Sequence, residues 1–230
     1  MRSDLMRALG PALVVGLLTA LVSAPAARAT HQLPNPPFFW DTNNDSVADP
    51  NAATIDADGA GWTQPKLDRL TEATDDWDNS TQWNPSRVVT GANNVYIDGT
   101  VDTCGINKDL QYAVTCVHYT NRETSTGQLF KDISLVNTTF NNELTRISSA
   151  FFWWYGSAHS SDTNSVDFGG ISSHEIGHWV FLNDLSGAAC NYGPSMYTMC
   201  GIYPIATADD DTWRTRNVTT DDINAVNIVY

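Results

Sequence analysis

The stretch HEIGHWVFLND, residues 174–184, is the most informative part of the chain. On an α-helix, residues four apart lie on the same face, so His174 and His178 can offer two imidazole nitrogens to one metal ion. A catalytic zinc site keeps three protein ligands and leaves a fourth position to water. Glu175 lies beside the first histidine and can take a proton from that water as a general base. The stretch therefore predicts a zinc centre, and the alternative is a helix that carries these side chains by chance.

A third protein ligand is needed, and the candidates downstream of the motif are carboxylates. None of the five histidines and none of the glutamates follows His178, which argues against a site completed by a glutamate on a later helix. Asp184 lies where the helix can end and the chain can turn back under the metal. If Asp184 does not bind the metal, it either contacts one of the residues that do or lies in an ordinary loop after the helix. The other downstream carboxylates are Asp209, Asp210, Asp211, Asp221 and Asp222.

With Asp184 in this place, the sequence resembles the metzincin metalloproteases, and among them the matrixin-like secreted bacterial enzymes. Their motif is HExxHxxGxxH, with aspartate at the last position in a minority, followed by a turn that contains methionine. Thr198-Met199-Cys200-Gly201 resembles that turn, in which the methionine packs beneath the zinc ligands. The resemblance covers roughly residues 60–230. It implies an α+β metzincin-like domain in which a twisted mixed sheet is joined by an N-terminal, an active-site and a C-terminal helix.

The sequence departs from the family at one position, where the family glycine is replaced by Phe181. That glycine lets the chain leave the helix sharply with a positive φ. A bulky residue in the left-handed conformation costs on the order of 1 kcal/mol or more. Either the turn differs here or the strain is tolerated.

The resemblance also implies where a substrate binds. The strand around Ile133–Thr139 is expected to be a sheet edge that pairs with an extended peptide, so Ile133 and Leu135 are candidate substrate-binding residues. Tyr203 and Pro204, just after the methionine turn, are expected to form a wall of the specificity pocket.

The first 29 residues predict a secretory signal peptide. Arg2 and Arg7 precede the apolar run 12–22, and Ala27-Arg28-Ala29 is a small-residue cleavage site. We therefore expect a secreted protein that begins with an extended lead-in, residues 30–62, and continues as a catalytic domain, residues 63–230. The net charge of −14 argues against nucleic acid or an anionic membrane as partner. A monomer with protein or peptide substrates is expected.

Local patterns predict the other elements. Pro65 begins a helix whose apolar residues recur to about Trp77, and residues 219–222 resemble a capping box before a last helix. Ser172 or Ser173 is the expected cap of the zinc helix. Strands are predicted at Val88–Thr90, Asn94–Ile97, Ala113–Tyr119 and Ile133–Phe140. Four cysteines suit an oxidising compartment and allow three pairings, of which Cys104–Cys116 with Cys190–Cys200 is favoured.

A calcium site is a weaker possibility in the lead-in. Asp41, Asn43, Asp45 and Asp49 occupy the first, third, fifth and ninth places of a run, as oxygen ligands do in calcium loops. Ser46 stands where such loops have glycine, and Ala52 stands where they have glutamate. A turn rich in aspartate and asparagine is therefore favoured, and a structural Ca²⁺ remains the alternative.

Together these patterns predict a secreted zinc-dependent metalloendopeptidase with His174, His178 and Asp184 as ligands and Glu175 as general base. The alternative is a secreted zinc-binding interaction module of the same fold that has lost catalysis, because Phe181 could misplace the third ligand. A hydrolase acting on a non-peptide amide is a third reading.

Overall fold

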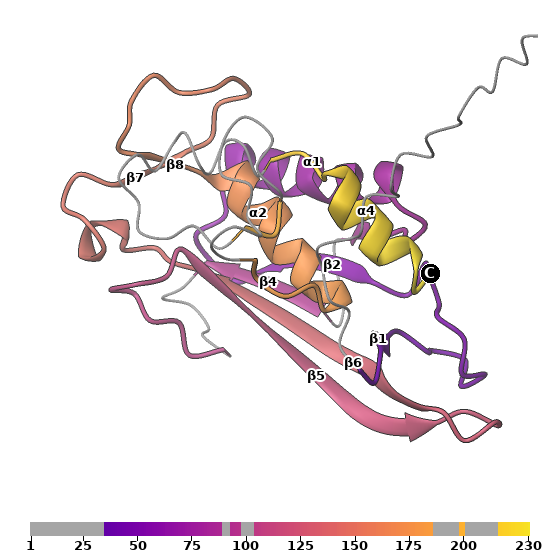
Figure 1. The fold of residues 1–230 in the computed structure, drawn as a ribbon. Coiled ribbons are helices and arrows are strands. Elements are labelled where there is room, and N and C mark those ends of the chain that lie inside the picture. Colours follow the sequence, from indigo (N-terminus) through magenta and orange to yellow (C-terminus); the bar gives the residue numbers. More distant parts are fainter. Residues whose placement is uncertain (1–34, 89–92, 98–103, 186–197, 201–215) are drawn as a thin grey trace, which may run out of the picture.

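The computed structural model describes residues 35–88, 93–97, 104–185, 198–200 and 216–230 (Figure 1). Over these residues the protein is a mixed α+β fold in which three α-helices lie on one face of a small open sheet (Figure 1). The predicted α+β class is therefore confirmed. The predicted signal peptide lies outside the described residues.

The sheet has six strands with one antiparallel neighbour pair. They are β1 (Phe38–Phe39), β2 (Thr54–Asp58), β3 (Ser86–Val88), β4 (Asn93–Ile97), β5 (Ala113–Glu123) and β6 (Leu129–Phe140). Side by side the order is β3, β2, β4, β6 and β5, and β1 pairs with another part of β6. Strands β5 and β6 are antiparallel and form a two-stranded ribbon, whereas the other neighbouring strands of the sheet are parallel.

The predicted edge strand is wrong. The segment around Ile133 and Leu135 belongs to β6, which pairs with β5 on one side and with β1 and β4 on the other. Among the described strands, β1, β3 and β5 have one partner each, and β5 is the edge strand beside β6. Both strands are rich in β-branched residues, so their composition does not distinguish an inner strand from an edge strand.

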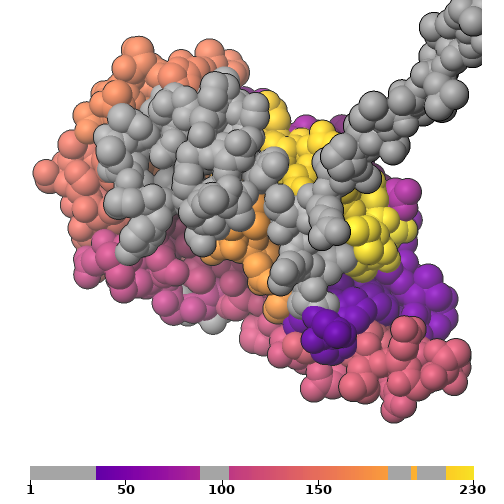
Figure 2. Space-filling model, viewed as in Figure 1, coloured from indigo at the N-terminus to yellow at the C-terminus, as the bar shows by residue number. Residues whose placement is uncertain are grey.

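The lead-in is part of the fold rather than a separate segment. It contributes β2, a strand that the sequence analysis missed and that lies between β3 and β4. It also contributes β1, whose Phe38 is 2% exposed and pairs with Lys131 of β6. In Figure 2 the indigo lead-in lies against the pink end of the β5–β6 ribbon. The boundary drawn between residues 62 and 63 therefore does not separate two structural units.

Helix α1 (Gln64–Ser80) confirms the predicted N-terminal helix, with Pro65 in its first turn. Its buried stripe includes Leu70, Ala73 and Trp77. The indole Nε1 of Trp77 donates to the backbone oxygen of Ser173, 2.9 Å away, in the next helix. This bond and the surrounding contacts fix α1 against the helix that carries the histidines.

Helix α2 (Phe168–Gly177) begins at a different residue from the one predicted. Ser172 and Ser173 lie inside it, and the cap is Asp167, whose Oδ1 accepts from the backbone N–H of Gly169 at 2.9 Å. Arg216 Nε donates to the other carboxylate oxygen at 3.0 Å. Burial raises the pKa of Asp167, and the Arg216 guanidinium opposes this shift. The buried pair joins the start of α2 to the C-terminal segment.

Helix α4 (Thr220–Asn227) confirms the predicted last helix. Asp222 is fully buried, and its carboxylate accepts from the backbone N–H of Thr219, as the capping pattern predicts. The Thr219 hydroxyl also donates to this carboxylate. Ala225 and Val226 bury the inner face of the helix. The remaining elements are the short helices η1 (Leu144–Arg146) and η2 (His178–Val180) and the two-stranded sheet β7 (Phe152–Trp154) and β8 (Ser165–Asp167).

The predicted disulfide Cys104–Cys116 is confirmed, with the two Cα atoms 5.6 Å apart. It attaches the segment before β5 to the strand itself. Cys190 lies outside the described residues, so the second pairing stays a prediction. In the described part of the chain, every helix is too short or too polar to cross a membrane.

Candidate metal centre

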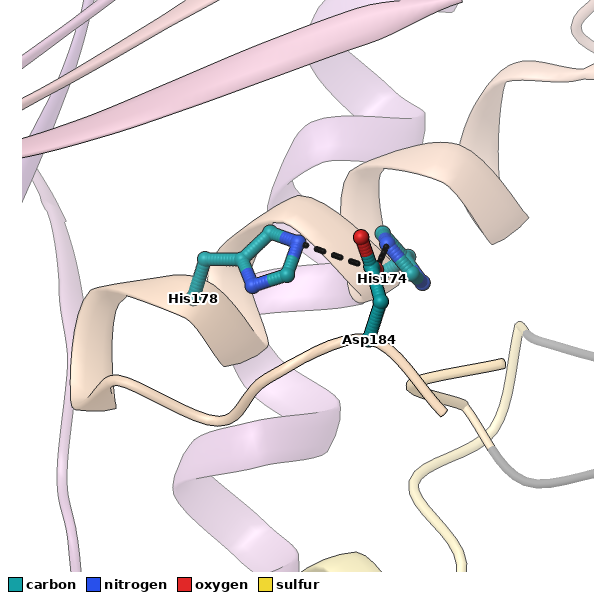
Figure 3. A group of neighbouring side chains, drawn as sticks. All are labelled: His174, His178 and Asp184. Atoms are coloured by element: carbon teal, nitrogen blue, oxygen red, sulfur yellow. Dashed lines mark ion pairs between the residues drawn. The ribbon is translucent and has the colours of Figure 1, made fainter. Parts of the chain in front are cut away.

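His174, His178 and Asp184 meet at the end of helix α2. The two histidines project from α2 and η2, and Asp184 reaches them from the loop that follows (Figure 3). Asp184 Oδ1 lies 2.9 Å from Nε2 of His174 and 3.4 Å from Nε2 of His178. The three possible ligand atoms lie within 4.8 Å of one another, so a single ion can bind all three.

The other nitrogen of each imidazole contacts a backbone oxygen. Nδ1 of His174 lies 2.9 Å from the oxygen of Thr198, and Nδ1 of His178 lies 2.6 Å from the oxygen of Leu182. A carbonyl can only accept, so both Nδ1 atoms carry hydrogen. Each Nε2 is then the nitrogen left for a metal ion, and the rings are oriented toward the same point.

The helix ends in the left-handed conformation at Phe181, with φ 62° and ψ 29°. The turn that the resemblance requires is therefore present despite the missing glycine, and the strain is tolerated. The Phe181 ring stacks on Phe38 with centroids 3.4 Å apart and meets Tyr119 edge-on at 6.3 Å. Aromatic pairs of this kind contribute about 0.5–1.5 kcal/mol, which offsets a cost of similar size.

The loop after the turn is tied to the segment around Met199. Leu185 N donates to Met199 O at 2.8 Å. Met199 is fully buried and packs against Gly177, where a β-carbon would collide with its Sδ atom. Gly177 lies between the two histidines in the sequence, so Met199 packs against the helix segment that carries them. Its role as the methionine of the turn stays a prediction. Met196 lies outside the described residues.

Glu175 lies beside the cluster and is 6% exposed. Its Oε2 accepts a hydrogen bond of 2.6 Å from the hydroxyl of Thr115 on β5. The sequence analysis did not identify Thr115, because threonine in a strand is ordinary and its proximity to Glu175 depends on the strand order. Glu175 is thus held at the wall of the site.

Charge pairing dominates the electrostatics of the cluster. Burial works to lower the pKa of His174, but the hydrogen bond and charge of Asp184 outweigh it and raise the pKa to about 9. Burial works to raise the pKa of Asp184, but the two imidazoles hold it well below its usual range. Since 60% of the Asp184 side chain is exposed, water screens this pairing. The carboxylate that stabilises protons on imidazole can equally pair with a cation.

The cluster opens into a cavity of about 740 Å³. Its wall includes β5 from Ala113 to Thr115 and Val117, together with neutral and apolar side chains of the preceding segment. Ile133 and Leu135 do not line it: Ile133 is 3% exposed in the core, and Leu135 is half-buried on β6. Tyr203 and Pro204 lie outside the described residues, so their role stays a prediction. The strand beside the candidate site is β5.

The cluster differs from the calcium-like run in the lead-in. There Asp41 Oδ1 accepts from the backbone N–H of Asp45 at 3.0 Å, and Asp45 Oδ1 accepts from that of Val47 at 2.8 Å. These are bonds of a turn rich in aspartate and asparagine. Over the described residues, no second group of three histidine, cysteine or acidic ligand atoms comes within 4.8 Å of one another. Calcium stays an untested possibility.

Comparisons with models of known protein families and with curated proteins gave no match to this chain.

Proposed function

We propose that the chain is a secreted zinc-dependent endopeptidase of the metzincin type. The observation that carries this proposal is the convergence of two imidazole Nε2 atoms and one carboxylate beside a buried glutamate, at the wall of an open cavity. A structural zinc site needs four protein ligands and no neighbouring general base. Three ligands beside a glutamate are the composition of a hydrolytic centre.

The donor set suits zinc better than the hard cations. Mg²⁺ and Ca²⁺ take oxygen ligands, whereas imidazole nitrogen with one carboxylate is a common zinc shell. When bound, zinc lowers the pKa of water toward about 7 and polarises a carbonyl group. Asp184 adds negative charge to the shell, so we expect a somewhat weaker Lewis acid than a third neutral imidazole would give.

The residues of the chain then have distinct roles. His174, His178 and Asp184 bind the metal ion. Glu175 accepts the proton of the attacking water on its carboxylate and passes it to the leaving amine. The edge of β5 offers backbone groups to an extended peptide, which gives affinity with few demands on side chains. Protein or peptide substrates follow from this arrangement.

The rival function is a zinc-binding interaction module without catalysis. This alternative was based on Phe181, which could misplace the third ligand. Asp184 instead lies 2.9 and 3.4 Å from the two Nε2 atoms, which favours the enzyme. The disulfide and the signal-like first 29 residues support secretion, and the net charge of −14 argues against nucleic acid as the partner.

The proposal is tested by measuring the zinc content of the purified secreted protein together with its hydrolysis of casein. Wild-type protein should bind one zinc and cleave, and a chelator should abolish cleavage until zinc is restored. Glu175→Gln should keep the zinc and lose cleavage by about 10²-fold or more. Glu123→Gln, at the exposed far end of β5, is the matched control. Zinc binding without cleavage of any peptide would instead favour the interaction module.

A further inference from the structure

A chain of three hydrogen bonds runs from the core to the carboxylate of Glu175. Trp179 Nε1 lies 3.0 Å from the hydroxyl of Thr138, which lies 2.7 Å from the hydroxyl of Thr115. Thr115 Oγ1 lies 2.6 Å from Glu175 Oε2. The chain links η2, the inner strand β6, the edge strand β5 and helix α2.

The direction of each bond follows from the chemistry of its partners. An indole N–H can only donate, so Thr138 accepts from Trp179 and keeps its own hydrogen. An ionised carboxylate can only accept, so Thr115 gives its hydrogen to Glu175. The bond between the two hydroxyls must then run from Thr138 to Thr115. All three donors point toward Glu175, and bonds aligned in this way strengthen one another.

The Trp179 and Thr138 end of this series of hydrogen bonds lies in the core, and Thr115 is half-buried at the cavity wall. Trp179 is fully buried, Thr138 is 1% exposed, and Thr115 faces Thr138 directly across the β5–β6 ladder. No bulk water competes for these hydroxyls at the Thr138 end. A free glutamate side chain has several rotamers, and holding one of them in advance removes an entropic cost from the reaction.

We propose that Thr115, supported by Thr138 and Trp179, is the positioning residue for Glu175. It fixes Oε2 and leaves the second oxygen, Oε1, available to exchange a proton with water. This inference rests on the proposed peptidase function, since it assigns the group that orients the general base. Strand β5 would then orient Glu175 as well as pair with a peptide along its edge.

The kinetic test compares Thr115→Val, which keeps the shape of the side chain, with Thr115→Ser, which keeps the hydroxyl, in the zinc-loaded protein. Thr115→Val should lower kcat by about 10- to 100-fold, with KM within about twofold and zinc content unchanged, because the base loses its orientation only. Thr115→Ser restores the hydroxyl and should recover most of kcat. Thr138→Val should lower kcat less, by about threefold to tenfold. Thr120→Val, at an exposed position of the same strand, is the control and should match wild type.

Two kinetic results overturn the inference. One is unchanged kcat in a fully zinc-loaded Thr115→Val protein. The other is a raised KM with unchanged kcat, which would assign Thr115 to peptide binding. A failure of Thr115→Ser to recover kcat would likewise show that the hydroxyl is not what matters.

A second readout needs no activity and separates this inference from the proposed function. A double-mutant cycle combines Thr115→Val with Glu175→Ala in the metal-free protein, with urea unfolding as the measurement. Thr115→Val should raise the unfolding equilibrium constant about tenfold when Glu175 is present and about twofold or less when it is absent. The pair Thr115→Val with Glu123→Ala should be additive. Additivity in the Glu175 cycle would overturn the inference, even in a protein that cleaves nothing.

Discussion

The two histidines of the cluster are held by different parts of the molecule. His174 is 7% exposed, and its partner Thr198 O lies 24 residues further along the chain. Thr198 in turn donates its N–H to Asp222 of α4 at 3.1 Å. His178 is half-buried, and its partner Leu182 O lies only four residues away. His174 is thus fixed by long-range contacts, and His178 by a local turn.

The His178 side of the cluster, or local half, depends on a strained residue. The His174 side is the buried half. Phe181 adopts a left-handed conformation so that Asp184 can return to the cluster, and its ring is held by Phe38 of the lead-in. The buried half has no such strain and is supported by α1, α4 and the Met199 segment. Substitutions in the local half and in the buried half should therefore differ in how they affect zinc affinity, its pH dependence and the stability of the fold.

Loss of Asp184 should have the largest effect, because it removes a ligand from the local half. Asp184→Ala is expected to weaken zinc binding by about 100-fold or more, beyond the 10- to 100-fold typical of changes outside the ligand shell. Asp184→His should keep the zinc and measurable activity. Competition with a chromogenic chelator measures both, with Asp78→Ala on the exposed side of α1 as control. Full zinc occupancy in Asp184→Ala would show that the ligand assignment is wrong.

The pH should act mainly on the buried half. The pKa of His174 is raised from 6.5 to about 9 in the metal-free protein, so zinc must displace its proton. Zinc affinity should therefore rise by about tenfold per pH unit between pH 7 and 9. The same shift stabilises the metal-free fold fully below about pH 6.5, and this contribution is lost as the pH rises through about 9. Zinc titrations and urea midpoints across this range measure both slopes, and a flat zinc affinity would contradict the assignment.

Asp222→Asn tests the long-range support of His174. The change leaves the size of the side chain but weakens its bond to the Thr198 N–H, which displaces the carbonyl that orients the imidazole. Zinc affinity should fall by about tenfold. Asp78→Asn serves as the control, since Asp78 is exposed on α1. Unchanged affinity would mean that α4 does not support the site.

The smallest effect is expected at Phe181, and it separates strain from packing. Phe181→Ala keeps the left-handed strain and loses the aromatic stack, whereas Phe181→Gly loses the stack and the strain together. The alanine variant should therefore be less stable than the glycine variant by about 1 kcal/mol in urea unfolding. Equal stabilities would show that the left-handed turn is not maintained. Phe152→Ala, an exposed aromatic on β7, is the control for loss of a ring.

Much of the site could be predicted because its signal is local. The histidine spacing follows from helix geometry, and Asp184 stood out by its short distance after His178. Met199 was singled out by the resemblance and not by local geometry. The turn at Phe181 could be stated only as an alternative, since its tolerance depends on Phe38, which lies far away in sequence. Local patterns therefore predicted which side chains come together, but not the distant contacts that hold them.

The errors arose where tertiary structure decides. Strand β2 was missed because Thr54–Asp58 has few apolar residues, although Ile55 is fully buried. The edge was assigned to β6 instead of β5 because strand order depends on pairing rather than on composition. The cap at Asp167 was missed because Gly169 and Gly170 leave the start of the helix ambiguous in the sequence. The bond from the Gly169 N–H to the Asp167 carboxylate shows where the helix begins.

The central claim is that His174, His178 and Asp184 bind one zinc ion together. Zinc X-ray absorption spectroscopy tests it most directly, on the loaded wild type and on Asp184→His. The wild type should show two imidazole ligands and oxygen neighbours at about 2.0–2.2 Å, and Asp184→His should show a third imidazole. Sulfur ligands, or the same spectrum in both proteins, would contradict the account.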